Sequence, residues 1–255
     1  ALIRTKFLTG MIPQRDVVKI SDKAMAGPLV FNGNVWFVTD SKLAYARENK
    51  DGVFGSGGSF DLYNGFKPQD MAVCKNKDES EDNLVVVGED GRWLSTNINE
   101  QTGKSPKSIA VVGKSLREGE HFKVACTDLD RDGKLEPIFV GSHGHVRANL
   151  LDGGDEIWAR EYKRGSRGTS GLKDETSGIA LGDINGDGYP EIVFLGDNLV
   201  YALDRFGIPI DGFLVTINRG TPIVGFHSDP ILVDVTGDKI PEILVPSSDD
   251  LVYAY

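Results

Sequence analysis

The chain has 255 residues, 40% of them hydrophobic, and a formal net charge of −10. This composition supplies a sizeable core and excludes a disordered acidic tail. The acidic balance argues against nucleic acid as the main partner, because phosphate binding needs clustered Lys and Arg. No apolar run approaches the roughly 18 residues of a membrane-spanning helix, so we expect no membrane span.

Short segments recur along the chain at a fixed interval. Residues 1–9 come first and carry enough apolar side chains to pair as a strand. Next comes Lys42–Ala46, a Leu-x-Tyr-Ala segment that is repeated at Asn198–Ala202 and Asp250–Ala254. The first and second tyrosines of these segments are 156 residues apart, and the second and third are 52 apart. A period of this length is typical of a repeat protein.

The long interval between the first two tyrosines holds two further units. Val73–Cys74 and Leu84–Gly88 correspond to Ala125–Cys126 and Pro137–Gly141 in the following unit. The sequence therefore predicts five units, at approximately 10–60, 61–114, 115–168, 169–220 and 221–255.

Each unit contains short runs rich in β-branched and aromatic residues, bounded by Gly, Pro, Asn and Asp. Such runs predict four strands per unit. Four-stranded units at intervals of roughly 40–55 residues predict the blades of a β-propeller. The competing architecture is a solenoid, but four strands are too many for one coil of a β-helix. We therefore expect an all-β chain that forms a single propeller domain of about five four-stranded blades over residues 1–255.

The two ends of the chain suggest how the ring closes. The last unit supplies three strands before residue 255, and residues 1–9 are left over before the first unit. Because an exposed sheet edge invites aggregation, we expect the N-terminal strand to complete the last blade. The alternative is that the five units are part of a larger propeller.

An acidic loop follows the first predicted strand of the fourth unit, at Asp183–Glu191. Its oxygen-bearing side chains at positions one, three and five can converge on one point, and Gly188 at position six permits the sharp turn. An EF-hand loop uses the same arrangement to give calcium about 6–8 oxygen ligands. The sequence predicts a Ca²⁺ site here, formed by the side chains of Asp183, Asn185, Asp187 and Glu191 and the carbonyl of Tyr189. The alternative is a hairpin with solvated acids.

Two more loops repeat this pattern. The loop of the third unit offers Asp128, Asp130, Asp132, the carbonyl of Lys134, and Glu136. The loop of the fifth unit offers Asp234, Thr236, Asp238, the carbonyl of Ile240, and Glu242. In the fifth unit Lys239 replaces the glycine, and a non-glycine residue tolerates positive φ poorly. We therefore expect two calcium sites and treat this loop as a third candidate.

The second unit departs further from the pattern. Asn76, Asp78 and Ser80 take the first three ligand positions, but Glu81 and Leu84 stand where the glycine and the closing acid belong. We expect a solvated acidic turn there.

The acidic loops, Val200–Asp204, Gly207–Phe213 and the 52-residue period together resemble the FG-GAP/VCBS repeats. That family includes the calcium-loop blades of integrin α-subunit propellers and many bacterial surface proteins. The resemblance is strong over residues 120–255. It implies calcium in the loop that joins the first two strands of a blade, where the ion braces the scaffold and in some members lines a ligand-binding face. It also implies an extracellular, cell-surface or periplasmic location, where calcium sites of about 10⁻⁴–10⁻³ M affinity suffice.

The histidines form no metal motif. His143 and His145 are two residues apart on a predicted strand and share a face, and we interpret them as surface histidines, since two ligands are too few for a structural zinc site. His121 and His227 each precede an acidic loop by seven residues. This offset would place both near one rim of the central channel, where we expect ordinary loop residues.

The cysteines and tryptophans are expected in the interior. Cys74 and Cys126 take matching strand positions in neighbouring blades, and we expect each to be a buried free thiol. We expect Trp36, Trp93 and Trp158 to pack between blades.

No catalytic motif is present: the sequence lacks a nucleophile elbow, a P-loop, a dinucleotide fingerprint and a zinc-protease helix. We therefore predict no catalytic residues and no organic cofactor. We expect a calcium-binding, extracytoplasmic recognition or adhesion module with a carbohydrate or protein ligand on a propeller face. The alternative is a polysaccharide-active lyase or hydrolase that uses channel-facing carboxylates.

Overall fold

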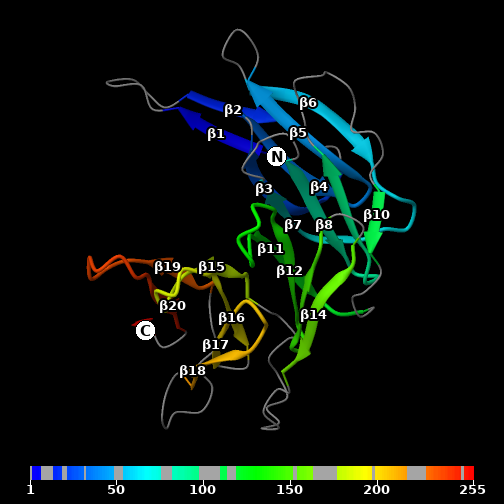
Figure 1. Ribbon diagram of the computed structural model, residues 1–255. Coiled ribbons are helices and arrows are strands. Elements are labelled where there is room, and N and C mark those ends of the chain that lie inside the picture. Colours follow the sequence, from blue (N-terminus) through cyan, green and yellow to red (C-terminus); the bar gives the residue numbers. More distant parts are fainter. Residues whose placement is uncertain are drawn as a thin grey trace.

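The structure, a computed structural model, is all-β (Figure 1). It describes residues 2–6, 14–18, 22–31, 33–48, 54–75, 82–97, 110–113, 119–151, 154–162, 177–196, 199–216, 228–247 and 250–255. Across these ranges no helix is long and apolar enough to cross a membrane.

Within the described ranges, four antiparallel sheets of four strands each follow one another along the chain, and we call them blades 1 to 4. Blade 1 comprises β3 (Ala24–Phe31), β4 (Asn34–Thr39), β5 (Lys42–Glu48) and β6 (Phe54–Asp61). Blade 2 comprises β7 (Pro68–Cys74), β8 (Asn83–Gly88), β9 (Trp93–Asn97) and β10 (Ala110–Gly113). Blade 3 comprises β11 (Phe122–Thr127), β12 (Glu136–Gly141), β13 (His145–Asn149) and β14 (Glu156–Glu161). Blade 4 comprises β15 (Ala180–Gly182), β16 (Glu191–Gly196), β17 (Leu199–Leu203) and β18 (Pro209–Thr216).

Blade 5 has three strands among the described residues: β19 (Ile231–Val233), β20 (Glu242–Pro246) and β21 (Val252–Ala254). The sheets succeed one another around an arc, with blade 1 at one end and blade 5 at the other (Figure 1). The predicted all-β propeller of four-stranded blades is confirmed.

Most of the core lies between successive blades. Each gap holds a separate apolar cluster, represented by Trp36 with Leu84, Trp93 with Phe139, Ile138 with Phe194, and Val193 with Ile243. The second strands β12 and β16 are buried almost throughout because a neighbouring blade covers each face. This two-sided burial explains why they are continuous apolar runs rather than alternating ones. The expected packing of the three tryptophans between blades is confirmed.

The N-terminal strand does not complete blade 5, so that expectation is corrected. β1 (Leu2–Lys6) pairs with β2 (Gln14–Val18) as a separate two-stranded sheet. This hairpin lies beside β6 of blade 1, at the opposite end of the arc from blade 5 (Figure 1). The physical reason is loop closure: joining strands eight residues apart costs far less chain entropy than joining the two ends of the chain.

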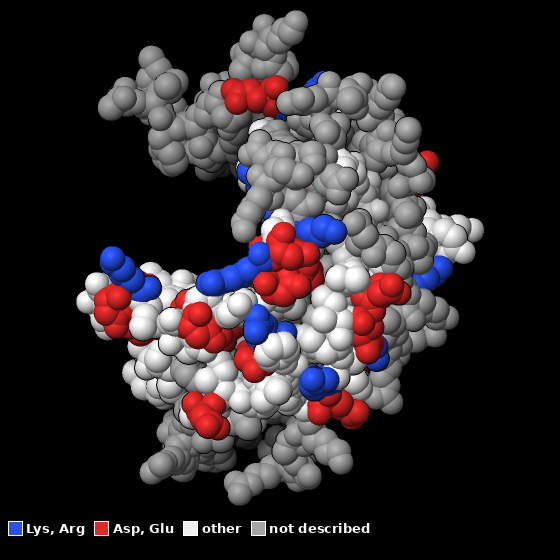
Figure 2. All heavy atoms as spheres, viewed as in Figure 1, with Lys and Arg blue, Asp and Glu red and all other residues white. Residues whose placement is uncertain are grey.

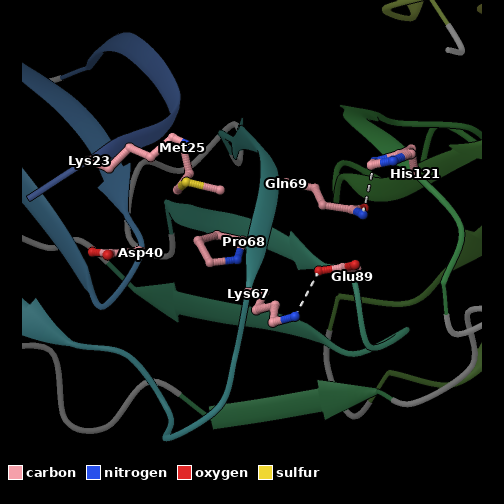
Figure 3. A pocket seen from close by; sticks show the side chains of 8 residues that line it. All are labelled: Lys23, Met25, Asp40, Lys67, Pro68, Gln69, Glu89 and His121. Atoms are coloured by element: carbon pink, nitrogen blue, oxygen red, sulfur yellow. Dashed lines mark hydrogen bonds and ion pairs between the residues drawn. The ribbon is translucent and has the colours of Figure 1, made fainter. Parts of the chain in front are cut away.

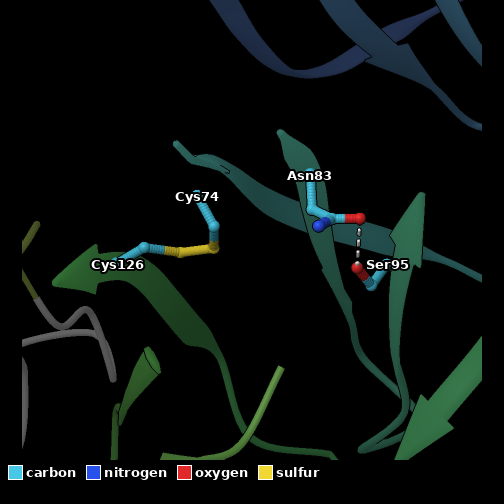
Figure 4. The surroundings of a disulfide bond; sticks show 4 residues. All are labelled: Cys74, Asn83, Ser95 and Cys126. Atoms are coloured by element: carbon cyan, nitrogen blue, oxygen red, sulfur yellow. Dashed lines mark hydrogen bonds between the residues drawn. A yellow bond between two sulfur atoms is a disulfide. The ribbon is translucent and has the colours of Figure 1, made fainter. Parts of the chain in front are cut away.

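The two cysteines are joined, so the expectation of free thiols is wrong. Cys74 ends β7 and Cys126 lies near the end of β11, and a disulfide links them across the gap between blades 2 and 3 (Figure 4). Their Cα atoms are 5.2 Å apart, within the range that a disulfide requires. The link is possible because repeat-equivalent positions on neighbouring first strands lie side by side. In the same region Ser95 Oγ donates a hydrogen bond to Asn83 Oδ1 (3.4 Å).

Candidate functional site

The three acidic loops connect the first and second strands of blades 3, 4 and 5. Since these first strands run in equivalent positions, the loops lie at the same end of their blades. In each loop the residues at positions four and six have positive φ, at Arg131 and Gly133, at Gly186 and Gly188, and at Gly237 and Lys239. Lys239 adopts φ 75°, close to the 87° of Gly188. Lys239 thus adopts a positive φ that a non-glycine residue tolerates poorly, and its N–H is held by the first aspartate of the loop.

Those hydrogen bonds are the same in all three loops. The first aspartate accepts the backbone N–H of position six, from Gly133 (3.1 Å), Gly188 (2.7 Å) and Lys239 (2.8 Å). The closing glutamate accepts the N–H of position two at 2.8 Å, from Leu129, Ile184 and Val235. The carboxylate at position five accepts the N–H of position seven, from Lys134, Tyr189 and Ile240. Each loop is thus curled around its own acidic side chains.

The predicted ligands converge to different degrees. Carboxylate oxygens of Asp128, Asp130 and Glu136 lie within 4.8 Å of one another, as do those of Asp234, Asp238 and Glu242. In the loop of blade 4 the amide of Asn185 joins the acids, because its Nδ2 donates to Asp187 (3.3 Å) and to Glu191 (3.1 Å). In blade 5 the hydroxyl of Thr236 donates to Glu242 (3.1 Å). The equivalent residues Asn76, Asp78, Ser80 and Glu81 of the second unit lie outside the described residues.

Two of the closing glutamates are buried beside other carboxylates. Glu191 is 0% exposed and Glu136 is 4% exposed. Burial, together with the charges of the neighbouring aspartates, raises the pKa of each glutamate to about 7. By contrast, backbone hydrogen bonds from Gly237 and Lys239 lower the pKa of the exposed Asp234. A hard cation would relieve the repulsion around Glu136 and Glu191, and an all-oxygen donor set is what calcium takes. The residues therefore fit a calcium ion.

A second candidate site lies at the other end of the first strands. A pocket of about 510 Å³ opens where blades 1, 2 and 3 meet (Figure 3). In it Lys67 pairs with Glu89 at 3.4 Å, and Gln69 is hydrogen-bonded to His121 at 3.3 Å. The pocket is further lined by Lys23, Met25, Asp40 and Pro68. His121 thus lines this pocket, while His227 lies outside the described residues.

Next to His121 is a residue that sequence reasoning missed. Glu120 has a side chain only 1% exposed, and its carboxylate accepts His143 N–H (2.7 Å) and bonds His145 Nδ1 (2.8 Å). His145 is therefore enclosed, with 14% of its side chain exposed, which corrects its interpretation as a surface histidine. In blade 2 the place of Glu120 is taken by Phe66: a Cβ added at Gly88 would meet Phe66, just as one at Gly141 would meet Glu120. The sequence did carry a signal for this residue: the third unit has a glutamate, Glu120, at the repeat position where the second unit has the apolar Phe66.

Two further acids make contacts between neighbouring blades. Asp70 accepts the N–H of Val124 from the next blade (3.0 Å), and Asp229 accepts the N–H of Gly178 from the preceding blade. Burial raises the pKa of Asp70. Both carboxylates thus join neighbouring blades.

The surface itself is mixed in charge. Figure 2 shows several clusters of Asp and Glu on one face, with Lys and Arg side chains lying between them. This interleaving means that the net charge of −10 is not a uniform acidic field on this face.

Comparisons with known proteins agree with this architecture. Residues 128–194 match the FG-GAP-like repeat, which covers the loops of blades 3 and 4. No curated protein matches the chain. Among solved structures, the chain is similar to BBS1N in its complex with ARL6DN, with 16% identity and a TM-score of 0.55 over 87% of this chain and 60% of that one. It is also similar to the WD40 β-propeller domain of Doa1, with 10% identity and a TM-score of 0.51 over 92% of this chain and 65% of that one. The chain thus spans less than two thirds of either structure.

Proposed function

We propose that this propeller is a calcium-binding recognition module that works outside the cytoplasm and binds a macromolecular ligand on one of its faces. The observation that carries the proposal is the repeated acidic loop, in which a buried glutamate is enclosed by other acids in blades 3 and 4. Once ionised, Glu136 and Glu191 in such surroundings would be stabilised by a compensating positive charge. Calcium would supply that charge and brace the start of each second strand.

Specific residues would hold the ions. In blade 3 they are Asp128, Asp130, Asp132, Glu136 and the carbonyl of Lys134. In blade 4 they are Asp183, Asn185, Asp187, Glu191 and the carbonyl of Tyr189. The equivalent blade 5 residues would form a third site, because that loop has the same backbone and hydrogen bonds.

The location rests on two arguments. Loops of this type in extracellular modules bind calcium at about 10⁻⁴–10⁻³ M, a level that the cytosol does not supply. The disulfide between Cys74 and Cys126 also favours an oxidising compartment, where such bonds persist. For the ligand, BBS1N was solved with a protein bound, which makes a protein ligand reasonable for this fold by analogy alone.

The calcium proposal is tested by thermal unfolding in calcium and in a chelator, with magnesium as the control cation. A ligand that binds only the native state adds about 2.7 kcal/mol per site at a hundredfold excess over its Kd. We expect the melting temperature to rise with calcium, to fall in chelator, and to respond less to magnesium, which prefers rigid octahedral sites. An identical melting curve in calcium and chelator would defeat the proposal.

The recognition function is tested on glycan and protein arrays probed with and without calcium, together with turnover assays on the same glycans. Calcium-dependent retention without turnover is the expected result. Turnover that disappears when an acid outside the loops is replaced would instead establish the enzymatic alternative.

A further inference from the structure

The turn between β17 and β18, Asp204–Ile208, is clamped by the preceding blade. Three successive carbonyl groups of the turn accept hydrogen bonds from side chains on or next to β14. The pairs are Trp158 Nε1 to Arg205 O (2.8 Å), Arg160 Nη2 to Phe206 O (3.0 Å) and Tyr162 Oη to Gly207 O. Within the turn, Asp204 Oδ1 accepts the N–H groups of Phe206 (2.9 Å) and Ile208 (2.8 Å). The turn is therefore rigid before any ligand arrives.

This turn presents Arg205 to an aromatic side chain of the acidic loop in the same blade. The Arg205 guanidinium carbon lies 3.8 Å from the ring centre of Tyr189 and 4.6 Å from that of Phe206. Arg131, from the acidic loop of blade 3, lies over the same Tyr189 ring at 4.5 Å. Arg131 reaches it across Gly188, where an added Cβ would collide with the guanidinium. We call Arg131, Arg160, Tyr189, Arg205 and Phe206 the arginine patch.

The arginines of the patch differ from other described arginines in their ion pairs. Elsewhere Arg92 is paired with Asp90, and Arg147 with Glu156. Among the described residues, no carboxylate forms an ion pair with Arg131, Arg160 or Arg205. A guanidinium group binds a carboxylate through two parallel N–H···O bonds. Arginines that form no ion pair within the described chain can therefore meet the carboxylates of another molecule.

The patch also has an apolar border. Phe206 and Ile208 are 51% and 53% exposed, although the turn that carries them is fixed. Arg and aromatic side chains on a rigid base are the residues that dominate protein–protein interfaces. A sugar ring needs an open aromatic face, but two guanidinium groups already lie over Tyr189. Arg205 also lies over the exposed ring of Phe206, and Trp158 is buried. These contacts favour a protein ligand over a carbohydrate.

We infer that the arginine patch is the docking surface for an acidic segment of a protein partner. Its carboxylates would meet Arg131 and Arg205, and an apolar side chain would rest on Phe206. The inference rests on the proposed recognition function and assigns its ligand class and surface. Calcium in the adjoining loops would neutralise Asp130, Asp132 and Asp187, and so leave the arginines as the dominant local charge.

The test is fluorescence anisotropy on the full chain in calcium with a short fluorescein-labelled peptide rich in glutamate and containing one leucine. The control probes are the same peptide with glutamine in place of glutamate, and a galacturonate oligosaccharide. We expect Arg205→Gln to weaken peptide binding about tenfold and Arg131→Gln to weaken it severalfold. Arg205→Lys should restore part of the affinity, because lysine keeps the charge but not the planar stacking.

Arg92→Gln is the matched control, since Arg92 also lies over a tyrosine ring, that of Tyr63 at 4.6 Å, but is paired with Asp90. It should leave the affinity unchanged. Equal binding of the glutamate and glutamine peptides, equal loss in Arg92→Gln and Arg205→Gln, or preference for the galacturonate would each overturn the inference. A calcium melt of the same samples separates the two proposals. A melting response without peptide binding rejects only the docking surface, and peptide binding without a melting response rejects only the calcium sites.

Discussion

The acidic loops of blades 4 and 5 share the same backbone conformation but differ in how deeply they are buried. In both loops the first aspartate accepts a hydrogen bond from the N–H of position six, and the closing glutamate accepts one from the N–H of position two at 2.8 Å. Yet Glu191 is 0% exposed, whereas Glu242 is partly exposed. The difference comes from the next blade: Cβ atoms added at Gly186 and Gly182 would meet Ile240 and Leu232 of blade 5.

On the equivalent side of blade 5, the described residues include no covering sheet. Val252 is 64% exposed, while its counterpart Val200 in blade 4 is 0% exposed. The comparison teaches that the repeat determines the shape of the loop, and the following blade determines how strongly its charges interact. Buried charges interact more strongly, because water screens them less.

The largest expected difference between the two loops lies in their response to calcium. Asp187→Ala should remove the stabilisation from one site, about 2.7 kcal/mol at a hundredfold excess of calcium. Asp238→Ala should remove less, because its loop is exposed to water. The measurement is denaturant unfolding of both variants at fixed calcium, with Asp155→Ala as an acid control outside the loops. Equal losses at the two positions would contradict the comparison.

A smaller effect should change sign with calcium. The pKa of Glu191 is about 7 in the fold against 4.5 for a free side chain, so the calcium-free protein should lose stability as pH rises from about 4.5 to about 7. Glu191→Gln should abolish the Glu191 part of that loss and leave the part due to Glu136, whose pKa is also about 7. The same substitution should stabilise the protein in chelator at pH 8 by about 1 kcal/mol, yet destabilise it in calcium. Glu242→Gln should stabilise the protein in chelator much less than Glu191→Gln does, because Glu242 is partly exposed. Parallel melting curves of the two variants from pH 4 to 8 test this.

The smallest effect concerns the backbone of the blade 5 loop. Lys239→Gly should stabilise the protein by about 0.5 kcal/mol, because glycine adopts positive φ without a steric cost, partly offset by the greater entropy of the unfolded chain. Lys239→Ala keeps the Cβ and should give no such gain. If both variants stabilise equally in equilibrium unfolding, the lysine charge and not its backbone is responsible.

The sequence predicts what repeats and misses what depends on contacts between repeats. The acidic loops and four-stranded blades follow from spacing and residue type, and the structure has both the blades and the curled loops. The sequence matched Cys74 with Cys126 but could not show that neighbouring first strands bring them within bonding distance. Glu120 was missed because its partners, His143 and His145, become neighbours only when β12 turns into β13. The N-terminal hairpin was missed because β1 pairs locally with β2, whereas we expected it to pair with the distant strands of blade 5.

The disulfide between Cys74 and Cys126 has a mechanical consequence. It closes a segment of 52 residues that includes β8, β9 and β10, so tension applied at the two ends of the chain passes through the sulfur atoms and bypasses that segment. An unlinked segment of this length would add roughly 170–190 Å when pulled straight. Under tension the oxidised chain therefore yields less length than the reduced one. Most of blade 2 remains within a covalently closed segment while the other blades extend.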